Sequence, residues 1–336
     1  YEKNPDFISP ASKKKEVISF VKGGLKDLSV SRKSFTWGIP VPDNDEHVIY
    51  VWLDALTNYI SALNYPDIKD PLFKKFWPAS IHLIGKDILR FHAVYWPAFL
   101  LAAKIPLPNK VYGHGWILSD EEKMSKSKGN ILDPIEIINQ YGLDPLRYYL
   151  IKEVSFGNDG NISQDRLEDC INSDLANNFG NLCQRVTAFA IKNCEGKIPK
   201  NINFEDEDLK LLDKFRLHLD IIRNKIDKQD INFYIDFIIN SLFETNKYFN
   251  DQEPWKKKND LIRLNTIVYT TLEIVRKISY LLYPIIPQSS VNALKIFKLS
   301  DNDINLTSIE NNEFLSKGTK INKIDILFKK IDKNND

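Results

Sequence analysis

The stretch Ile81-His82-Leu83-Ile84-Gly85-Lys86-Asp87 decides the fold that we expect for the first part of the chain. Its apolar, β-branched beginning predicts a buried strand that ends at Gly85. Helical spacing starts at Asp87, because apolar and aromatic residues recur three or four positions apart, at Ile88, Phe91, Tyr95 and Phe99. A further strand follows at residues 110–113. Strand, helix and strand in succession are typical of a parallel sheet, whose ligand crevice lies at the carboxyl ends of the strands.

Two more segments precede this unit in the sequence. Residues 48–53 are β-branched and aromatic, and they predict another buried strand. Residues 1–35 are more polar and predict a helix followed by a turn at Gly23-Gly24. The first part of the chain is therefore expected to have an α/β nucleotide-binding fold of the Rossmann-like kind.

The lysine-rich stretch Lys123-Met124-Ser125-Lys126-Ser127 follows a strand-like run that ends near Leu118. Lysine is a compact cation on a flexible stem, and serine hydroxyls and loop N–H groups donate to phosphate oxygens. We interpret the stretch as a phosphate-binding loop at the same crevice as Gly85 and Asp87. A solvated surface loop is the alternative interpretation.

Beyond residue 120 the composition changes, because five of six tryptophans and four of five histidines precede that point. Apolar residues with helical spacing predict an all-α antiparallel bundle with short connections. The expected helices lie at residues 134–140, 144–152, 164–194, 206–228, 231–250, 258–283 and 287–297. In the tail after residue 300, we expect five apolar residues to pack back on the body: Ile321, Ile324, Ile326, Leu327 and Phe328.

Charge and cysteine content exclude several classes of protein. The chain carries 46 basic and 45 acidic side chains, so any contact with RNA must come from local patches. Its 3 cysteines share no CxxC spacing, which argues against a disulfide framework or a zinc site and fits the reducing cytoplasm. No apolar run approaches the roughly 18–20 residues of a membrane span, so we expect no membrane partner. From the cysteine pattern we expect no metal-ligating residues in this chain.

Aromatic and histidine residues suggest an apolar pocket near the crevice. Trp52 and Tyr59 lie seven residues apart, and aromatic walls favour a thioether side chain. Asp87 stands where a carboxylate often binds ribose, and His92 follows it in the helix, where it can close the pocket. The alternatives are core aromatics, an Asp87 that only caps its helix, and a His92 whose hydrogen bonds are satisfied in the core.

A second group of residues suggests an RNA-binding surface in the helical part. Asn177, Asn181 and Arg185 recur at four-residue spacing, and Trp255 precedes the basic run Lys256–Lys258. Asparagine and arginine can read base edges, tryptophan can stack on bases, and lysine can bind phosphate. A solvated helix face with a core tryptophan is the competing interpretation.

Together these segments resemble the methionyl-tRNA synthetase family, in its short bacterial form. Lys123–Ser127 matches the second signature of class I aminoacyl-tRNA synthetases. Four further segments match the methionyl family: residues 50–55, residues 82–98, the Asn177, Asn181 and Arg185 set, and Pro254-Trp255. The resemblance implies four segments: the carboxyl-terminal half of the catalytic domain at 1–118, the signature loop and stem-contact region at 119–160, a helical anticodon-binding domain at 161–299, and a tail at 300–336.

The resemblance also implies roles for matching positions. Trp52, Tyr59 and His92 would bind methionine, and Gly85 and Asp87 would contact the adenosine part of ATP. Lys126, with Lys123 in support, would act on the phosphates together with Mg²⁺. The residues that would read the CAU anticodon of tRNA(Met) are Asn181, Arg185 and Trp255.

The sequence also departs from the family pattern. The His-Ile-Gly-His type signature is absent, as are the first half of the nucleotide fold and the inserted connective domain, where any zinc would lie. The chain begins at Tyr1 and has no methionine before Met124. We therefore expect it to be part of a longer protein and to be inactive alone.

The resemblance implies ATP-dependent attachment of methionine to tRNA through a methionyl-adenylate. Such a reaction needs no protein nucleophile, so catalysis rests on positioning and charge stabilisation. One alternative is another class I synthetase for an aliphatic amino acid or cysteine. The other is a non-catalytic tRNA-binding module.

Overall fold

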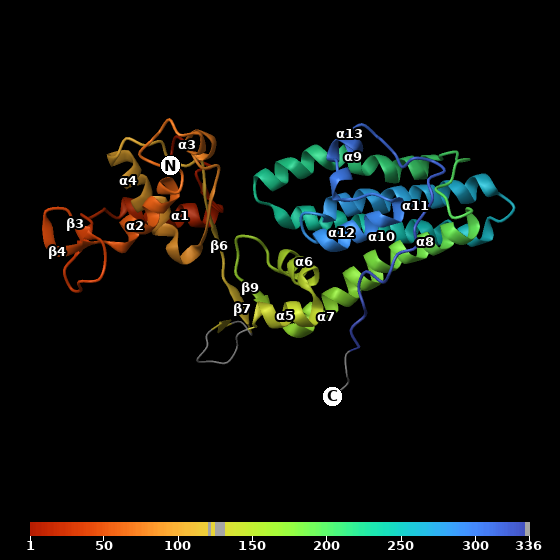
Figure 1. Ribbon diagram of the computed structural model, residues 1–336, viewed down its shortest axis with the longest axis horizontal. Helices are drawn as coiled ribbons and strands as arrows, with labels where there is room; N and C mark the ends of the chain where they lie inside the picture. The colour runs from red at the N-terminus through yellow and green to blue at the C-terminus, as the bar shows by residue number, and fades with distance from the viewer. Residues whose placement is uncertain (120–121, 125–131, 333–336) are drawn as a thin grey trace. The chain divides into compact units, whose positions relative to one another are not determined.

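The computed structural model describes residues 1–119, 122–124 and 132–332. The chain forms two compact units, which we describe separately (Figure 1). The first comprises Tyr1–Trp116 together with Gly157–Asp159, and the second comprises Ile117–Phe156 and the chain from Gly160 onward. In the described residues, no helix is long and apolar enough to cross a membrane.

The first unit contains the predicted parallel sheet. Its strand order is β1 (Ile8–Ser9), β6 (Val111–His114) and β5 (His82–Gly85), and both pairings are parallel. Gly85 pairs with His114, so the carboxyl ends of β5 and β6 lie at the same edge. The predicted crevice therefore has its two expected strands.

Helices cover this sheet and supply its core. After β5 the chain is helical through η1 (Lys86–Ile88), η2 (Phe91–Tyr95) and α4 (Trp96–Ala102), which confirms the helix predicted from Asp87. Helix α1 (Ala11–Lys22) follows β1. The core beside the sheet contains Ile8 of β1, Val17 of α1, Ile84 of β5, Val111 of β6, and Leu89, which lies between η1 and η2.

The strand predicted at residues 48–53 is wrong in its second half. Strand β4 (Asn44–Ile49) pairs with β2 (Ser31–Arg32) and β3 (Pro40–Val41), and helix α2 (Val51–Ser61) begins directly afterwards. The apolar run is thus a strand end plus the first turn of a helix. Trp52, Leu56 and Tyr59 recur at helical spacing, and packing of that face outweighs local β propensity. The shorter α3 (Pro71–Phe76) follows α2.

The second unit begins with a small sheet of β8 (Glu122–Lys123), β7 (Ile117–Ser119) and β9 (Gly160–Ile162). Two helices follow this region, α5 (Pro134–Tyr141) and α6 (Leu143–Glu153), close to the predicted bounds. Asp133 caps α5, because its carboxylate accepts the N–H of Ile135 at 2.7 Å. These elements join the lysine-rich stretch to the helical bundle in sequence.

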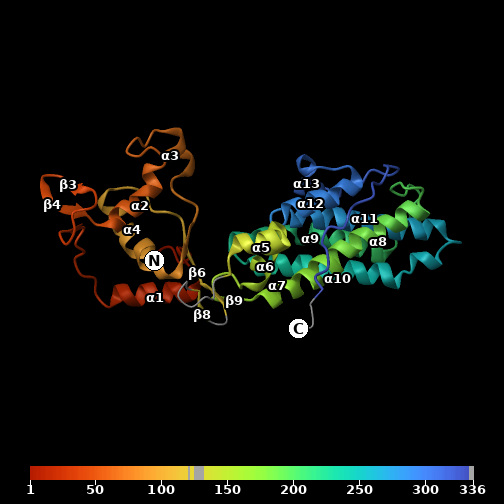
Figure 2. The same ribbon diagram turned by 60° about the horizontal axis from the view of Figure 1, so that its bottom comes forward.

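The bundle confirms the all-α part of the predicted fold, as Figures 1 and 2 show. One helical run comprises α7 (Gln164–Cys170), η4 (Ile171–Gly180) and α8 (Asn181–Asn193). Beside it lie α9 (Asp206–Asp227), α10 (Ile231–Asp251), η5 (Pro254–Lys256), α11 (Leu261–Leu282) and α12 (Pro287–Leu294). Nearly every residue of α11 is buried, so this helix forms the centre of the bundle.

The tail packs on the bundle as predicted, with one exception. It follows η6 (Lys295–Phe297) and contains η7 (Asp301–Asp303) and α13 (Leu306–Glu310). Ile321 and Phe328 are buried, and Ile324 and Leu327 pack against the core. The prediction for Ile326 is wrong, because its side chain is 63% exposed. Residues 321–330 form neither helix nor strand, so no regular period decides which of these side chains face the core.

Lys277, a fully buried lysine of α11, gives the first testable prediction. Its ammonium donates to the carbonyl of Leu212 at 3.0 Å, and burial lowers its pKa to about 8. In the unfolded chain the pKa is about 10.5, so the unfolded state binds more protons between these values. We compare the free energies of unfolding of the wild type and of Lys277→Met. The difference, wild type minus variant, should rise by about 3 kcal/mol at most between pH 8 and pH 10.5. Urea unfolding at several pH values measures this difference, and a flat difference would contradict it.

Candidate functional site

The three residues predicted to bind methionine lie together in the first unit. Trp52 and Tyr59 come from α2, and His92 comes from η2. The Nδ1 atom of His92 lies 3.1 Å from the carbonyl oxygen of Ile88, which can only accept, so Nδ1 carries the proton. Nε2 must then accept, and the Tyr59 hydroxyl donates to it at 2.9 Å. His92 is therefore satisfied and fixed in orientation.

More aromatic residues surround this pair than the sequence prediction assigned. Phe91 stacks on Trp52 with ring centroids 3.8 Å apart and an interplanar angle of 9°. The indole N–H of Trp96 donates to Nε2 of His82 at 3.2 Å, and the His82 ring lies 4.2 Å from that of Tyr59. Phe91 and Trp96 both lie in the predicted helical stretch, and each packs on an aromatic residue of α2, Phe91 on Trp52 and Trp96 on Tyr59. His82 had no comparable signal beyond its place in a buried strand.

The protonation states of this cluster follow from burial. Burial and the neighbouring His92 lower the pKa of His82 to about 4. Burial also lowers the pKa of His92, against the opposing effect of its bond to Ile88, and it raises the pKa of Tyr59. All three side chains are therefore uncharged near pH 7. An uncharged aromatic wall suits an apolar, polarisable side chain.

The predicted nucleotide residues lie at the carboxyl end of β5. A Cβ atom at Gly85 would lie 2.6 Å from Oδ1 of Asp87, so a larger residue there would displace this carboxylate. Asp87 lies in the first turn of η1, and its Oδ1 accepts the indole N–H of Trp116 at 3.4 Å. Gly85 thus keeps the backbone accessible beside a carboxylate, which is the arrangement expected for a ribose contact.

A lysine beside this carboxylate was not assigned a role from the sequence. Both carboxylate oxygens of Asp159 lie 2.6 Å from the ammonium of Lys86. The same ammonium lies 4.1 Å from the centre of the Trp116 ring. The motif Gly85-Lys86-Asp87 could have suggested Lys86, whereas Asp159 is 73 residues away and had no signal.

The two catalytic lysines predicted from the signature loop are only partly within the described structure. Lys123 lies in β8, where it pairs with Leu118 of β7. Lys126 lies outside the described residues, and its role stays a prediction. Among the described residues, no group of three or more His, Cys, Asp or Glu side chains could hold a metal ion.

The predicted anticodon residues gather on one face of the bundle. Asn181 is exposed at the start of α8, and Arg185 follows one turn later. The guanidinium of Arg185 donates to Oδ1 of Asn250 at 2.6 Å and lies 5.6 Å from the centre of the Phe249 ring. The Trp255 ring packs edge-on against the same Phe249 ring, with centroids 6.2 Å apart, and the Trp255 residue remains 41% exposed. Phe249 and Asn250 therefore join Arg185 and Trp255 into one surface that leaves an indole open to solvent.

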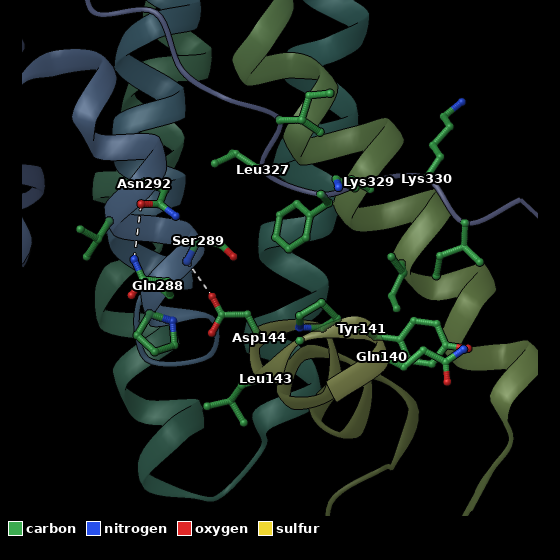
Figure 3. Close-up of a pocket in the computed structure, with 18 of the residues that line it drawn as sticks. Gln140, Tyr141, Leu143, Asp144, Gln288, Ser289, Asn292, Leu327, Lys329 and Lys330 are labelled. Carbon is green, nitrogen blue, oxygen red and sulfur yellow. Dashed lines mark hydrogen bonds between the residues drawn. The ribbon is translucent and has the colours of Figure 1, made fainter. Parts of the chain in front are cut away.

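A cavity of about 950 Å³ in the second unit contains none of the predicted site residues (Figure 3). Its walls come mainly from the end of α5, from α6 and α12, and from the tail at residues 326–331. Asp144 is buried there, and its carboxylate accepts the backbone N–H of Ser289 at 2.6 Å. The carboxylate stabilises the first turn of α12, so its hydrogen bond has a structural explanation.

Comparisons with known proteins agree with these observations. Residues 1–187 match the family model described as tRNA synthetases class I (M), and residues 198–336 match the anticodon binding domain of methionyl tRNA ligase. Methionine–tRNA ligase of Rickettsia felis is 52% identical over 297 residues, which cover 86% of this chain and 57% of that protein. The corresponding Brucella suis protein is 50% identical, with 88% and 58% covered.

Solved structures give the same result. Mycobacterium tuberculosis methionyl-tRNA synthetase in complex with methionyl-adenylate superposes with a TM-score of 0.93 at 43% identity. The match covers 98% of this chain and 65% of that one. The chain thus spans about 58% of the length of the Brucella suis relative. It belongs to the methionyl family of class I tRNA synthetases.

Proposed function

We propose that the full-length protein containing this chain is a methionine–tRNA ligase. The methionine carboxylate attacks the α-phosphorus of ATP, which releases pyrophosphate and gives methionyl-adenylate. A terminal ribose hydroxyl of tRNA(Met) then attacks the acyl carbon and releases AMP. The observation that carries the proposal is the neutral aromatic wall of Trp52, Tyr59 and His92, which lies against His82 of β5.

This wall accounts for the choice of amino acid. The Tyr59 hydroxyl donates a hydrogen bond to the neutral His92 ring, and burial keeps both side chains uncharged. Neither therefore presents a charge to the pocket. Aromatic rings attract a thioether sulfur, so a wall of this kind favours methionine among the apolar amino acids. A pocket for a charged amino acid would need a buried counter-ion, and neither α2 nor η2 carries a buried Asp, Glu, Lys or Arg, since Asp54 of α2 is exposed.

The ATP part of the proposal rests on the edge of the sheet. Gly85 leaves space for the adenosine to approach the backbone, and Asp87 offers a carboxylate to the ribose hydroxyls. Lys126 and Lys123 would stabilise the negative charge that develops on the phosphates, with Mg²⁺ bound to the phosphate oxygens. No protein side chain forms a covalent bond in this scheme.

The RNA part of the proposal rests on the bundle. Asn181, Arg185 and Trp255 would read the CAU anticodon, Trp255 by stacking its exposed indole on a base. Charging of tRNA places such an enzyme in the cytoplasm. The segments proposed are 1–118, 119–160, 161–299 and 300–336, with anticodon binding in the third. The structural division after Trp116 lies close to the first of these boundaries.

Two other functions can be separated from this one by experiment. A class I synthetase for another aliphatic amino acid would keep the lysine loop but would not need the bond between Tyr59 and His92. A non-catalytic tRNA-binding module would bind tRNA without using ATP. Charging of a CAU-anticodon tRNA with labelled methionine by the full-length protein tests the proposal, and binding without charging would favour the module.

Trp255→Ala is expected to weaken use of this tRNA and to spare adenylate formation. Stacking of a base on an aromatic ring contributes about 1–3 kcal/mol, so kcat/KM for tRNA should fall roughly tenfold or more. Phe76→Ala is the matched control, because it removes a similarly exposed ring from α3 in the other unit. An equal loss of ATP–pyrophosphate exchange in Trp255→Ala would show that Trp255 only supports the fold.

A further inference from the structure

The loop Gly157–Asp159 belongs to the first unit, although the chain on both sides of it belongs to the second. The loop packs so closely against the end of β6 that glycine is needed at two of the contact positions. A Cβ atom at Gly115 would collide with the backbone carbonyl of Asn158, and one at Gly157 would lie 2.7 Å from the Tyr112 hydroxyl. Gly157 also has a φ of +101°, which favours glycine. The two glycines therefore allow the loop to approach the sheet edge closely.

This approach places the Asp159 carboxylate in three contacts. Its two oxygens lie 2.6 Å from the ammonium of Lys86, and Oδ1 also accepts the backbone N–H of Trp116 at 2.9 Å. Lys86 in turn lies over the Trp116 ring. The ion pair holds the pKa of Asp159 below its usual range. An exposed ion pair alone contributes little, but here the backbone and an indole ring fix both partners.

Lys86 stands between Gly85 and Asp87, the residues that we propose for the nucleotide. The indole of Trp116 donates to the Asp87 carboxylate and lies under the Lys86 ammonium. It therefore contacts both the carboxylate proposed to bind ribose and the neighbouring cation. An unrestrained lysine side chain has many rotamers. If it is already held in one of them, less conformational entropy is lost when a ligand binds. Asp159 thus fixes the position of the cation nearest to Asp87 along the chain.

We propose that Asp159 is a positioning residue of the ATP site, which holds the Lys86 ammonium over Trp116 where a nucleotide phosphate can meet it. This proposal rests on the proposed function, because it takes Gly85 and Asp87 as the nucleotide contacts. Asp159 itself does not touch ATP. Its effect must therefore pass through Lys86.

The test is ATP binding by calorimetry on the full-length protein, with Asp159→Asn and Lys86→Met alone and combined. We expect Asp159→Asn to raise the Kd for ATP about five- to tenfold. The effect is moderate because Lys86 keeps its charge and loses only the partner that holds it in place. In the Lys86→Met background the same change should have little further effect. Asp159→Glu should restore part of the affinity. Glu244→Gln is the matched control, because it breaks a comparable exposed pair with Lys214 in the second unit.

Gly115→Ala provides an independent variant, because it displaces the loop without changing any charge. It should weaken ATP binding to a similar extent while the methionine affinity stays near the wild-type value. Wild-type ATP affinity in Asp159→Asn, or an undiminished effect in the Lys86→Met background, would overturn the inference. Absence of methionine-dependent pyrophosphate exchange in the wild type would instead contradict the proposed function, and the two failures are therefore distinguishable.

Discussion

Lys126→Ala is expected to slow methionyl-adenylate formation by roughly two orders of magnitude, because one charge contact to the transition state contributes on the order of 3 kcal/mol. A lysine acts here as a cation that follows the phosphates, and alanine cannot replace it. Methionine affinity should remain nearly unchanged, since Trp52, Tyr59 and His92 belong to other elements. Pyrophosphate exchange by the full-length protein measures the rate.

Lys128→Ala is the control for this experiment, because it removes a lysine from the same stretch but outside the five-residue signature. Its exchange rate should stay within a few-fold of the wild type, because the proposal gives Lys128 no part in binding the phosphates. An unchanged rate in Lys126→Ala would remove this residue from the catalytic group. Equal losses in both variants would indicate a general electrostatic effect of the loop.

Tyr59→Ala is expected to raise the KM for methionine by about 10–100-fold and to leave the KM for ATP nearly unchanged. The substitution removes the ring from the pocket wall and leaves Nε2 of His92 without its donor. A pocket discriminates by only about 1–3 kcal/mol per methylene, so ring loss should also weaken discrimination against leucine and norleucine. Tyr59→Phe should have a smaller effect, because it keeps the ring.

Tyr65→Ala separates pocket loss from simple destabilisation. Tyr65 packs on Phe73 in the same cluster, with ring centroids 6.0 Å apart, and we assign it no contact with methionine. Both variants should lose stability, but only Tyr59→Ala should change the methionine KM. If the two variants have the same KM, Tyr59 is a core residue and the substrate assignment loses its structural support.

Local periodicity predicted most elements of the fold. The bundle helices appear near the expected residues, because long amphipathic patterns have few alternative structures. The parallel pairing of β5 and β6 followed from the order strand, helix, strand. Prediction failed at Tyr50, where a strand ends and a helix begins within one apolar run. Short apolar runs fit either structure, and only packing of α2 on its neighbours decides between them.

The candidate site was only partly predictable for a related reason. Trp52, Tyr59 and His92 could be named from their segments, but the hydrogen bond that orders Tyr59 and His92 depends on how α2 packs on η2. The interpretation of His92 as a satisfied histidine is correct, and it is compatible with a place in the pocket wall. Asp159 had no signal, since its partner Lys86 lies 73 residues earlier and the contact requires the loop to return to the sheet.

The most direct test of the central claim is ATP–pyrophosphate exchange by the full-length protein with each of the twenty standard amino acids in turn. The neutral aromatic wall and the nucleotide edge of β5 predict exchange that depends on methionine and is far weaker with leucine, isoleucine, valine or cysteine. Exchange driven best by one of those amino acids, or no exchange with any amino acid, would contradict the assignment as a methionine–tRNA ligase.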